Sequence, residues 1–370
     1  MIGSSGHLFE ETSGCAQIIR SPDRPITRLL LVAFFALSRT PAPRSETLSF
    51  PRDHGSHSDA PVEWWYYTGH LQDAAHHEYG FQATFFRARE MHFAHFAWTD
   101  VARQTFDYAE KSHLGLPGIA SAALDRLNVS NEDWSASESS DGRVRLHARA
   151  TFGELDLELS ASKPPVLNGP GGLSRKGAGP DEYSHYVSIP RWKAAGSFRR
   201  QASRLSVSGT AWFDHEWGPG ALPKDARGWD WFGVQLEDGS DLMLYRMRGE
   251  NGEATPFSGG TFSPARGPSA PVLWRDVAFT QSSPWRSPRS GAEYPARWTI
   301  RVRSLDLELE IEPQLPDQEL VTEQSTGVVY WEGTCRVRGT RGGQPITGRA
   351  YAELTGYARR DVPGFGPAKN

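Results

Sequence analysis

The sequence is poor in cysteine and methionine, with only 2 Cys and 4 Met among 370 residues. Two thiols cannot build a disulfide scaffold or an all-thiolate zinc site. Neither sign of charge dominates, because 40 basic and 44 acidic residues leave a net charge of -4, so nucleic-acid binding is not expected. The sequence has no Gly-Xaa-Ser-Xaa-Gly elbow, phosphate-binding loop or dinucleotide fingerprint. Covalent nucleophilic catalysis is therefore disfavoured, and we expect no cofactor.

Long apolar runs are also scarce, and the one near the N-terminus is Leu29–Leu37 (LLLVAFFAL). This run is too short to span a bilayer as a helix. Three arginines precede it and a small-x-small step, Ala36-Leu37-Ser38, ends it, which is typical of a secretory signal peptide. We therefore expect residues 1–45 to be a signal peptide and disordered extension, and the mature chain to be secreted or periplasmic without a transmembrane segment. The alternative is a cytoplasmic protein with an apolar N-terminal arm.

Aromatic and turn-forming residues are abundant, with 13 Trp, 37 Gly and 26 Pro. From residue 60 onward, short aromatic and β-branched runs alternate with Gly, Pro, Asp and Asn, which predicts strands joined by turns. Helical periodicity is scarce, and its best instance, Leu114–Leu127, is weak. The predicted strands are Glu63–Leu71, Tyr79–Arg87, Phe93–Asp100, Arg143–Phe152, Leu155–Ser160, Glu182–Ile189, Leu205–Phe213, Trp229–Leu236, Leu242–Met247, Ala296–Arg303, Leu305–Glu312, Gly327–Val337 and Arg349–Tyr357.

Strands without βαβ alternation predict an all-β fold of antiparallel barrels or sandwiches. Two stretches rich in Gly and Pro, Lys163–Pro180 and Pro256–Pro271, are predicted to be irregular loops. A boundary near Arg199–Ser206 divides the mature chain into a first domain of residues 46–204 and a second of residues 205–362.

One segment rich in aromatic rings runs from Glu63 to His70 (EWWYYTGH). The period of two of a strand makes both of its faces aromatic, so it is buried on both sides or lines a cavity. The rings either fill a barrel or form a ligand site, because buried Tyr and Trp need hydrogen-bond partners that a pocket can use. The candidate ligand-binding residues in this segment are Glu63, Trp65, Tyr67 and His70.

A second segment, Trp212–Gly218 (WFDHEWG), places two acids and a histidine among indoles. Apolar surroundings raise a carboxyl pKa towards neutrality, so Asp214, His215 and Glu216 are candidate general acid/base residues. Strand alternation points His215 away from both acids, and no second His pair lies at ligand spacing, so we expect no metal site. The alternative is that these residues tie together an interdomain turn. Trp217 is a further candidate ligand-binding residue.

A third segment, Gly228–Phe232 (GWDWF), places its two indoles on one face of a strand and its acid on the other. Such an acid is either paired with a nearby arginine, Arg227 or Arg246, or lies in a pocket. The candidate ligand-binding residues of this region are Trp229, Asp230, Trp231 and Tyr245.

These segments resemble the AttH / carotenoid 1,2-hydratase family of lipocalin-like proteins, from about Phe50 to Tyr357. The resemblance implies two lipocalin-like β-barrel domains packed together. The motifs that carry it are Phe50–Gly55 (FPRDHG), Glu63–Leu71, Phe93–Asp100, Lys163–Ser174, Asp214–Gly218 (DHEWG), Trp229–Trp231 (WDW), Leu315–Glu319 (LPDQE), Tyr330–Gly333 (YWEG) and Glu353–Tyr357 (ELTGY).

The family includes hydratases that add water across an isoprenoid double bond, predicted secreted hydrolases, and components linked to ABC transport systems. The resemblance therefore implies an apolar, isoprenoid or lipid-like ligand, with the Asp214–Glu216 group supplying the acid and indole faces stabilising a cation. One position departs from the hydratase branch, which has an acid soon after a Tyr where this chain has Tyr245-Arg246-Met247. The alternative is a non-catalytic lipid carrier associated with an ABC-type envelope export system.

Overall fold

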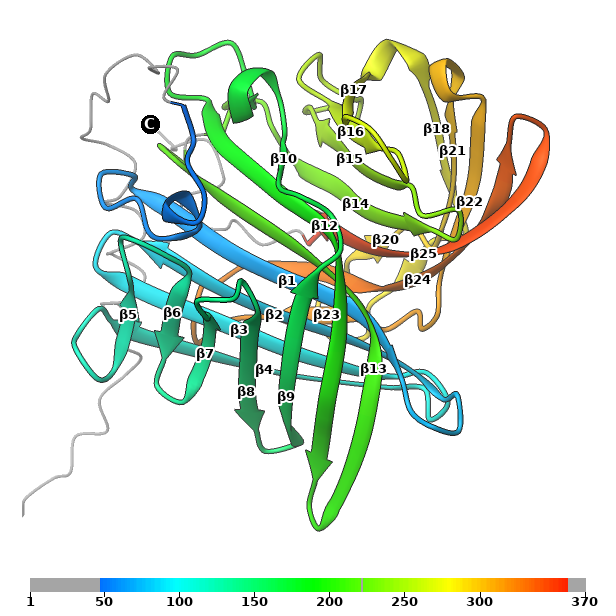
Figure 1. Cartoon of the computed structure of the whole chain (residues 1–370). Coiled ribbons are helices and arrows are strands. Elements are labelled where there is room, and N and C mark those ends of the chain that lie inside the picture. Colours follow the sequence, from blue (N-terminus) through cyan, green and yellow to red (C-terminus); the bar gives the residue numbers. More distant parts are fainter. Residues whose placement is uncertain (1–46, 221, 359–370) are drawn as a thin grey trace, which may run out of the picture.

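The computed structural model describes residues 47–220 and 222–358, so the predicted signal peptide lies outside the described residues. The described chain forms two large antiparallel sheets, each curled into a nearly closed barrel (Figure 1). The predicted all-β class and the two lipocalin-like barrels are confirmed. Among the described residues, no helix has the length and apolar character that crossing a bilayer requires.

The first barrel is a 13-stranded sheet with the order β4-β3-β2-β1-β13-β12-β9-β8-β7-β6-β5, in which β10 and β11 also pair with β12. Two 3₁₀ turns, η1 (Arg52–His54) and η2 (Pro170–Gly172), lie in its loops. Its strands are β1 (Val62–Gln72), β2 (Glu78–Ala88), β3 (Met91–Asp100), β4 (Thr105–Leu114), β5 (Ala120–Ala122), β6 (Asn128–Asn131), β7 (Trp134–Glu138), β8 (Val144–Ala150), β9 (Gly153–Ala161), β10 (Val166–Leu167), β11 (Leu173–Arg175), β12 (Tyr183–Arg200) and β13 (Ser203–Gly218).

The second barrel is a 10-stranded sheet with the order β17-β16-β15-β14-β25-β24-β22-β21-β18, in which β23 pairs with β24. A separate ribbon of β19 and β20 lies beside it, with 3₁₀ turns η3 (Trp274–Asp276) and η4 (Arg303–Leu305). The strands are β14 (Gly228–Leu236), β15 (Asp241–Arg248), β16 (Gly259–Ser263), β17 (Ala270–Leu273), β18 (Val277–Ser282), β19 (Trp285–Arg286), β20 (Glu293–Tyr294), β21 (Arg297–Val302), β22 (Leu307–Pro313), β23 (Glu319–Val321), β24 (Val329–Arg341) and β25 (Gln344–Thr355).

Strand alternation decides which rings fill each barrel. Trp65 and Tyr67 of β1 pack inside the first barrel with Phe213 of β13, and Phe232 and Trp298 pack inside the second. Their neighbours in sequence face outward, where the outer faces of the two sheets meet. One face of these aromatic strands therefore fills a barrel, as one of the two alternatives predicted, and the other face packs where the two barrels meet.

Each predicted strand occurs with shifted ends, but several strands were not predicted. The stretch Pro256–Pro271, predicted to be a loop, contains β16 and the start of β17, and Leu114–Leu127 forms β5 and turns instead of a helix. The boundary predicted after residue 204 falls next to the turn between β12 and β13. β13 pairs with β1 and β12 and so belongs to the first sheet, and the second sheet begins at β14, which pairs with β25.

Candidate active site

The outward faces of β1, β12 and β13 form the first wall of a seam between the barrels. In this wall Tyr66 pairs with Asp214, and Asp214 pairs with Ser188, so the three residues form one row across the strands. Trp64 and Glu216 pair in the next row. Strand register thus places both acids of β13 towards the second barrel.

The second barrel contributes the facing wall from β24, β25 and β14. Glu332 pairs with Glu353, and Glu353 pairs with Trp231, so these residues form a matching row. Trp231 joins the two walls, because its ring packs edge-on against Tyr66 with centroids 5.3 Å apart. Its indole N–H also donates a hydrogen bond of 2.8 Å to the Tyr186 hydroxyl. The two sheets are therefore held together through aromatic residues that surround carboxyl groups.

Asp214 lies buried in this seam and accepts hydrogen bonds from three neighbouring side chains. The donors are the hydroxyls of Tyr186 and Ser188, at 2.6 and 2.5 Å, and the Trp212 indole, at 2.7 Å. Burial raises the pKa of Asp214 to about 7, although these hydrogen bonds oppose the shift. A carboxyl with a pKa near neutrality can donate a proton and take one back at physiological pH.

Glu332 and Glu353 form a second carboxyl group on the facing wall. Glu332 is buried and Glu353 is partly exposed. Burial raises the pKa of both groups, and the charge of Glu353 raises that of Glu332 further. Like charges directly opposite each other on adjacent strands disfavour double ionisation, so the pair holds a proton near neutral pH.

Glu216, the other acid of β13, has a different environment. The Lys176 ammonium lies 2.8 Å from its carboxylate, and 5.2 and 5.0 Å from the ring centres of Tyr186 and Tyr245. Burial acts to lower the pKa of Lys176, but the charges of Glu216 and Tyr245 raise it above its ordinary value. Asp214 thus faces neutral donors and Glu216 faces a cation, an arrangement that gives two acids on one strand separate roles.

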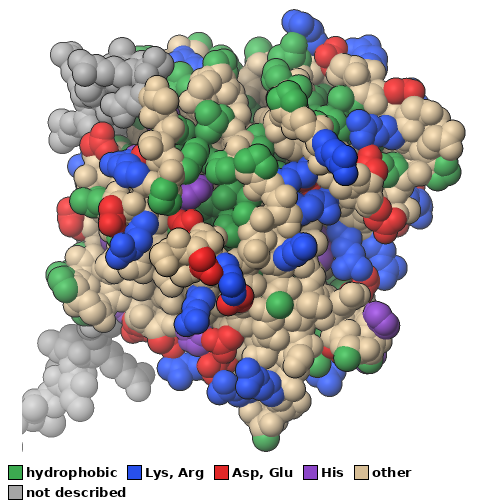
Figure 2. Space-filling model, in the orientation of Figure 1, with side chains coloured by type: hydrophobic (Ala, Val, Ile, Leu, Met, Phe, Trp, Pro, Cys, Tyr) green, Lys and Arg blue, Asp and Glu red, His purple; other side chains and the backbone are tan. Residues whose placement is uncertain are grey.

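A cavity of about 1100 Å³ adjoins the seam, between the loops around β10 and β11 and the strands β15 to β17. Met243 and Tyr245 line it and also pack with the aromatic residues around Asp214. Leu167 and Leu273, exposed by 39% and 43%, line it further out. Figure 2 shows hydrophobic side chains gathered in this region of the upper surface. An apolar ligand in this cavity would lie next to the carboxyl groups.

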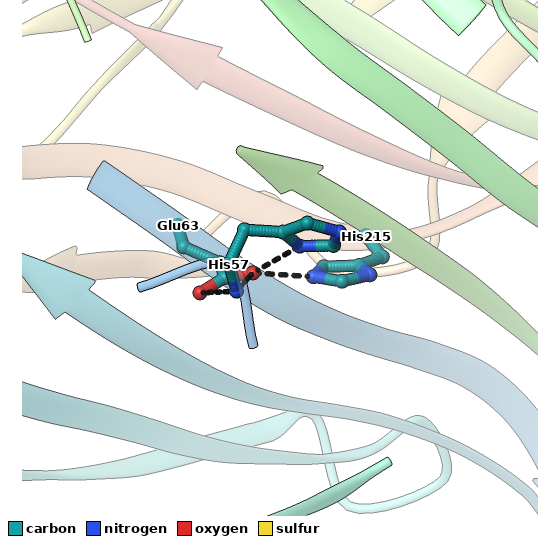
Figure 3. Close-up of side chains that lie close together, drawn as sticks. All are labelled: His57, Glu63 and His215. Atoms are coloured by element: carbon teal, nitrogen blue, oxygen red, sulfur yellow. Dashed lines mark hydrogen bonds and ion pairs between the residues drawn. The ribbon is translucent and has the colours of Figure 1, made fainter. Parts of the chain in front are cut away.

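Other predicted residues lie on the opposite face of β1 and β13. His215 contacts Glu63 and not the acids beside it in sequence, with Nε2 3.0 Å from Glu63 Oε1 (Figure 3). His57 lies 2.9 Å from the same oxygen and stacks on Trp217 with ring centres 3.8 Å apart. Trp65 stacks on His215 with ring centres 5.0 Å apart. The structure therefore separates these residues from Asp214 and Glu216.

The remaining predicted residues are distributed between the seam and the barrel interiors. Trp229, Trp231 and Tyr245 pack in the seam, whereas Tyr67 is part of the first barrel's core. His70 contacts the Thr334 hydroxyl at 2.9 Å, further along the interface, and burial lowers its pKa to about 3.

Asp230 is buried away from the seam and is paired with arginine, one of the two alternatives left open by the sequence. Its carboxylate lies 2.9 Å from Arg246 and 3.1 Å from Arg248, and it accepts a hydrogen bond of 2.8 Å from Tyr357. Arg227, the other predicted partner, lies instead near Glu250. Asp230 therefore holds one end of the second barrel together.

Sequence reasoning missed six residues of the seam. Glu332 and Glu353 were noticed only as parts of the YWEG and ELTGY family motifs. Tyr66 lies on the outward face of β1. Tyr186 and Ser188 follow from strand register, which local sequence patterns do not show, and Lys176 lies in the loop after β11. The missed residues are Tyr66, Lys176, Tyr186, Ser188, Glu332 and Glu353.

Comparison with known proteins places this chain among related two-barrel proteins. A putative AttH from Nitrosomonas europaea is 36% identical, with a TM-score of 0.79 over 86% of this chain and 100% of the other. Kievitone hydratase from Nectria haematococca shares the fold at 18% identity, with a TM-score of 0.68 over 85% of this chain and 93% of the other.

Among curated sequences, the dehydratase asqC of Emericella nidulans is 21% identical over 196 residues. That match spans about half of each protein, 51% of this chain and 52% of the relative. The AttH-like family model matches residues 41–357 and so covers both barrels. The chain therefore belongs to the AttH-like family.

Proposed function

We propose that the protein is a hydratase-like enzyme that adds water to a carbon–carbon double bond of an apolar, isoprenoid or lipid-like substrate. The observation that carries the proposal is the group of buried carboxyls around Asp214, next to an apolar cavity and lined by aromatic rings. Two proteins that this chain resembles, kievitone hydratase and the dehydratase asqC, support this class of reaction.

In the proposed mechanism, Asp214 donates its proton to one alkene carbon, and a carbocation forms at the other. The faces of Trp212, Trp231 and Tyr66 stabilise this cation, because an aromatic ring carries negative potential on its face. Water then attacks the cation, and the ionised member of the Glu332/Glu353 pair takes the proton that the water loses. The glutamate pair releases this proton and Asp214 takes one up before the next turnover, so that the reaction consumes no net proton. The reverse sequence is a dehydration.

Turnover should fall as the pH rises through about 7, because the raised pKa of Asp214 means that its protonated form is lost there. Tyr186→Phe removes a hydrogen bond that favours the ionised form, so the alkaline limb should move to higher pH. The measurement is kcat against pH for both proteins. A limb that stays in place in Tyr186→Phe would argue against Asp214 as the acid.

The cavity should hold the substrate, so charges introduced into its apolar wall should weaken binding. We expect Leu167→Asp and Leu273→Asp each to reduce the affinity for an apolar ligand by about tenfold or more. Leu116→Asp, which changes another exposed leucine outside the cavity wall, is the matched control. Binding is measured by native mass spectrometry of the purified protein, and equal affinities in all variants would contradict this placement.

The same experiment separates the enzyme from a lipid carrier, which requires the apolar cavity but no acid. A copurified ligand that remains unaltered after prolonged incubation would favour a carrier, and a product that has gained one water favours the enzyme.

We also propose an extracytoplasmic location, because arginines precede the apolar run Leu29–Leu37. Cell fractionation tests this location, and recovery in the cytoplasmic fraction contradicts it.

A further inference from the structure

A second buried group of ionisable side chains lies behind the seam, on the opposite face of β1 and β13 (Figure 3). His57 precedes β1, Glu63 is on β1 and His215 is on β13, and all three are buried. Both imidazoles point at one oxygen, Glu63 Oε1, from 2.9 and 3.0 Å. The three ligand atoms lie within 4.8 Å of one another. This group takes no part in the chemistry proposed for the seam.

The outer nitrogen of His215 shows where its proton lies. Nδ1 is 3.1 Å from the backbone carbonyl oxygen of Asp53, which can only accept a hydrogen bond, so Nδ1 carries the N–H. In a neutral ring, Nε2 then presents a lone pair to Glu63 Oε1, which also has only lone pairs. Two such atoms 3.0 Å apart in a buried site repel each other unless a cation lies between them.

His57 repeats this arrangement beside it. Its Nδ1 faces Glu63 Oε1 at 2.9 Å and its Nε2 faces the Asp53 carboxylate at 3.3 Å, so a neutral ring can donate to only one of these acceptors and presents a lone pair to the other. While Glu63 and Asp53 are ionised, protons can satisfy all of these contacts only if both imidazole rings are cationic, and the ring centres lie only 5.5 Å apart. One divalent ion supplies the same two charges at a single point that all three donors share.

We propose that His57 Nδ1, Glu63 Oε1 and His215 Nε2 bind a divalent first-row metal ion, for which zinc is the best match. Two imidazoles and a carboxylate are typical zinc ligands, at distances of about 2.0–2.2 Å. Ligand atoms around one tetrahedral ion then lie roughly 3.3 Å apart. The observed separations of 2.9 and 3.0 Å need to open only slightly. Water supplies the fourth ligand, as is usual for zinc with three protein ligands.

The surrounding residues orient these ligands. Both outer imidazole nitrogens are held by Asp53, one by its carboxylate and one by its carbonyl, which is the second layer of contacts that metal-binding histidines have. Arg87 and Ser56 bind the other carboxylate oxygen, Glu63 Oε2, and the backbone N–H of His57 donates to Oε1 from 3.0 Å, which holds Oε1 towards the two imidazoles. The ion would tie the loop before β1 to β13, the strand that carries Asp214.

The test is the metal content and the zinc affinity of the full chain. We expect about one tightly bound zinc per protein, and cobalt in its place should give the strong visible absorption of a four-coordinate site. His57→Gln should lower zinc affinity by about tenfold or more. His77→Gln is the matched control, because it changes a histidine whose side chain is 56% exposed.

Thermal unfolding at constant pH then distinguishes a metal ion from protons. A chelator should lower the Tm of the wild-type protein, and added zinc should restore it. The chelator should lower the Tm of His57→Gln by less than it lowers that of the wild type, because the variant binds zinc more weakly. A wild-type protein that binds no zinc and has the same Tm with and without chelator would overturn the proposal, whether or not His57→Gln folds.

Discussion

Asp214→Asn is expected to lower turnover by about 10³-fold while the protein stays folded, because positioned proton transfer contributes roughly 10² to 10⁴ in rate. Asparagine keeps the shape of the side chain, and its amide oxygen can still accept the hydrogen bonds that Ser188 and Trp212 donate, but it has no acidic proton to transfer. Steady-state kinetics on an apolar alkene substrate measure the loss. Asp238→Asn, which changes a partly exposed acid paired with Arg341, is the matched control and should keep full activity.

The stability of the same variant provides a check on the environment of Asp214. Its folded-state pKa of about 7 lies above the ordinary value of 3.8, so ionisation favours the unfolded chain. The contribution of Asp214 to stability is therefore complete below about pH 4 and is lost as the pH rises through about 7. Asp214→Asn should remove this part of the pH dependence. If the unfolding free energy of Asp214→Asn depended on pH in the same way as that of the wild type, the pKa of Asp214 would not be raised in the folded protein.

Asp230→Ala is expected to destabilise the protein by about 3–5 kcal/mol, because it leaves two buried arginines without their carboxylate. Arg246 and Arg248 are only 12% and 8% exposed at their side chains, so solvent cannot replace Asp230. Urea unfolding measures the change in free energy. Turnover per folded molecule should stay the same, since Asp230 lies outside the seam.

The matched control for this variant is an ion pair at the surface. Glu310→Ala breaks a pair with Arg338, whose side chain is 62% exposed, and should cost much less than Asp230→Ala, because water replaces the lost partner. Equal losses from the two variants would contradict a structural role for Asp230. A loss of turnover in folded Asp230→Ala would return it to the candidate ligand-binding residues.

Local patterns predicted the fold well because strand alternation and turn residues are properties of short segments. The period of two alone predicted that Asp214 and Glu216 lie on one face of their strand and His215 on the other. The pairing of Glu332 with Glu353 did not, since it depends on the register of β24 against β25. Their position opposite Asp214 depends on how the two barrels pack.

Local sequence patterns could not predict the cluster of His57, Glu63 and His215 either, because tertiary structure brings these residues together. His57 lies in a loop and His215 is far along the chain, so no ligand spacing in the sequence joins them. The strand β16 was missed for a different reason, because the local pattern was misleading: its Gly259 and Gly260 suggested a loop. Both glycines are held in a ladder between β15 and β17, where tertiary pairing outweighs their weak preference for strands.

The central claim is that the seam between the barrels adds water to an apolar alkene by acid catalysis from Asp214. The most direct measurement is the mass of the product formed in water labelled with oxygen-18, with wild-type protein and Asp214→Asn compared at equal ligand occupancy. The account predicts a labelled hydroxyl in the wild-type product and unchanged ligand bound to Asp214→Asn. Label incorporated equally by both proteins, or a wild-type protein that returns its ligand unaltered, would contradict it.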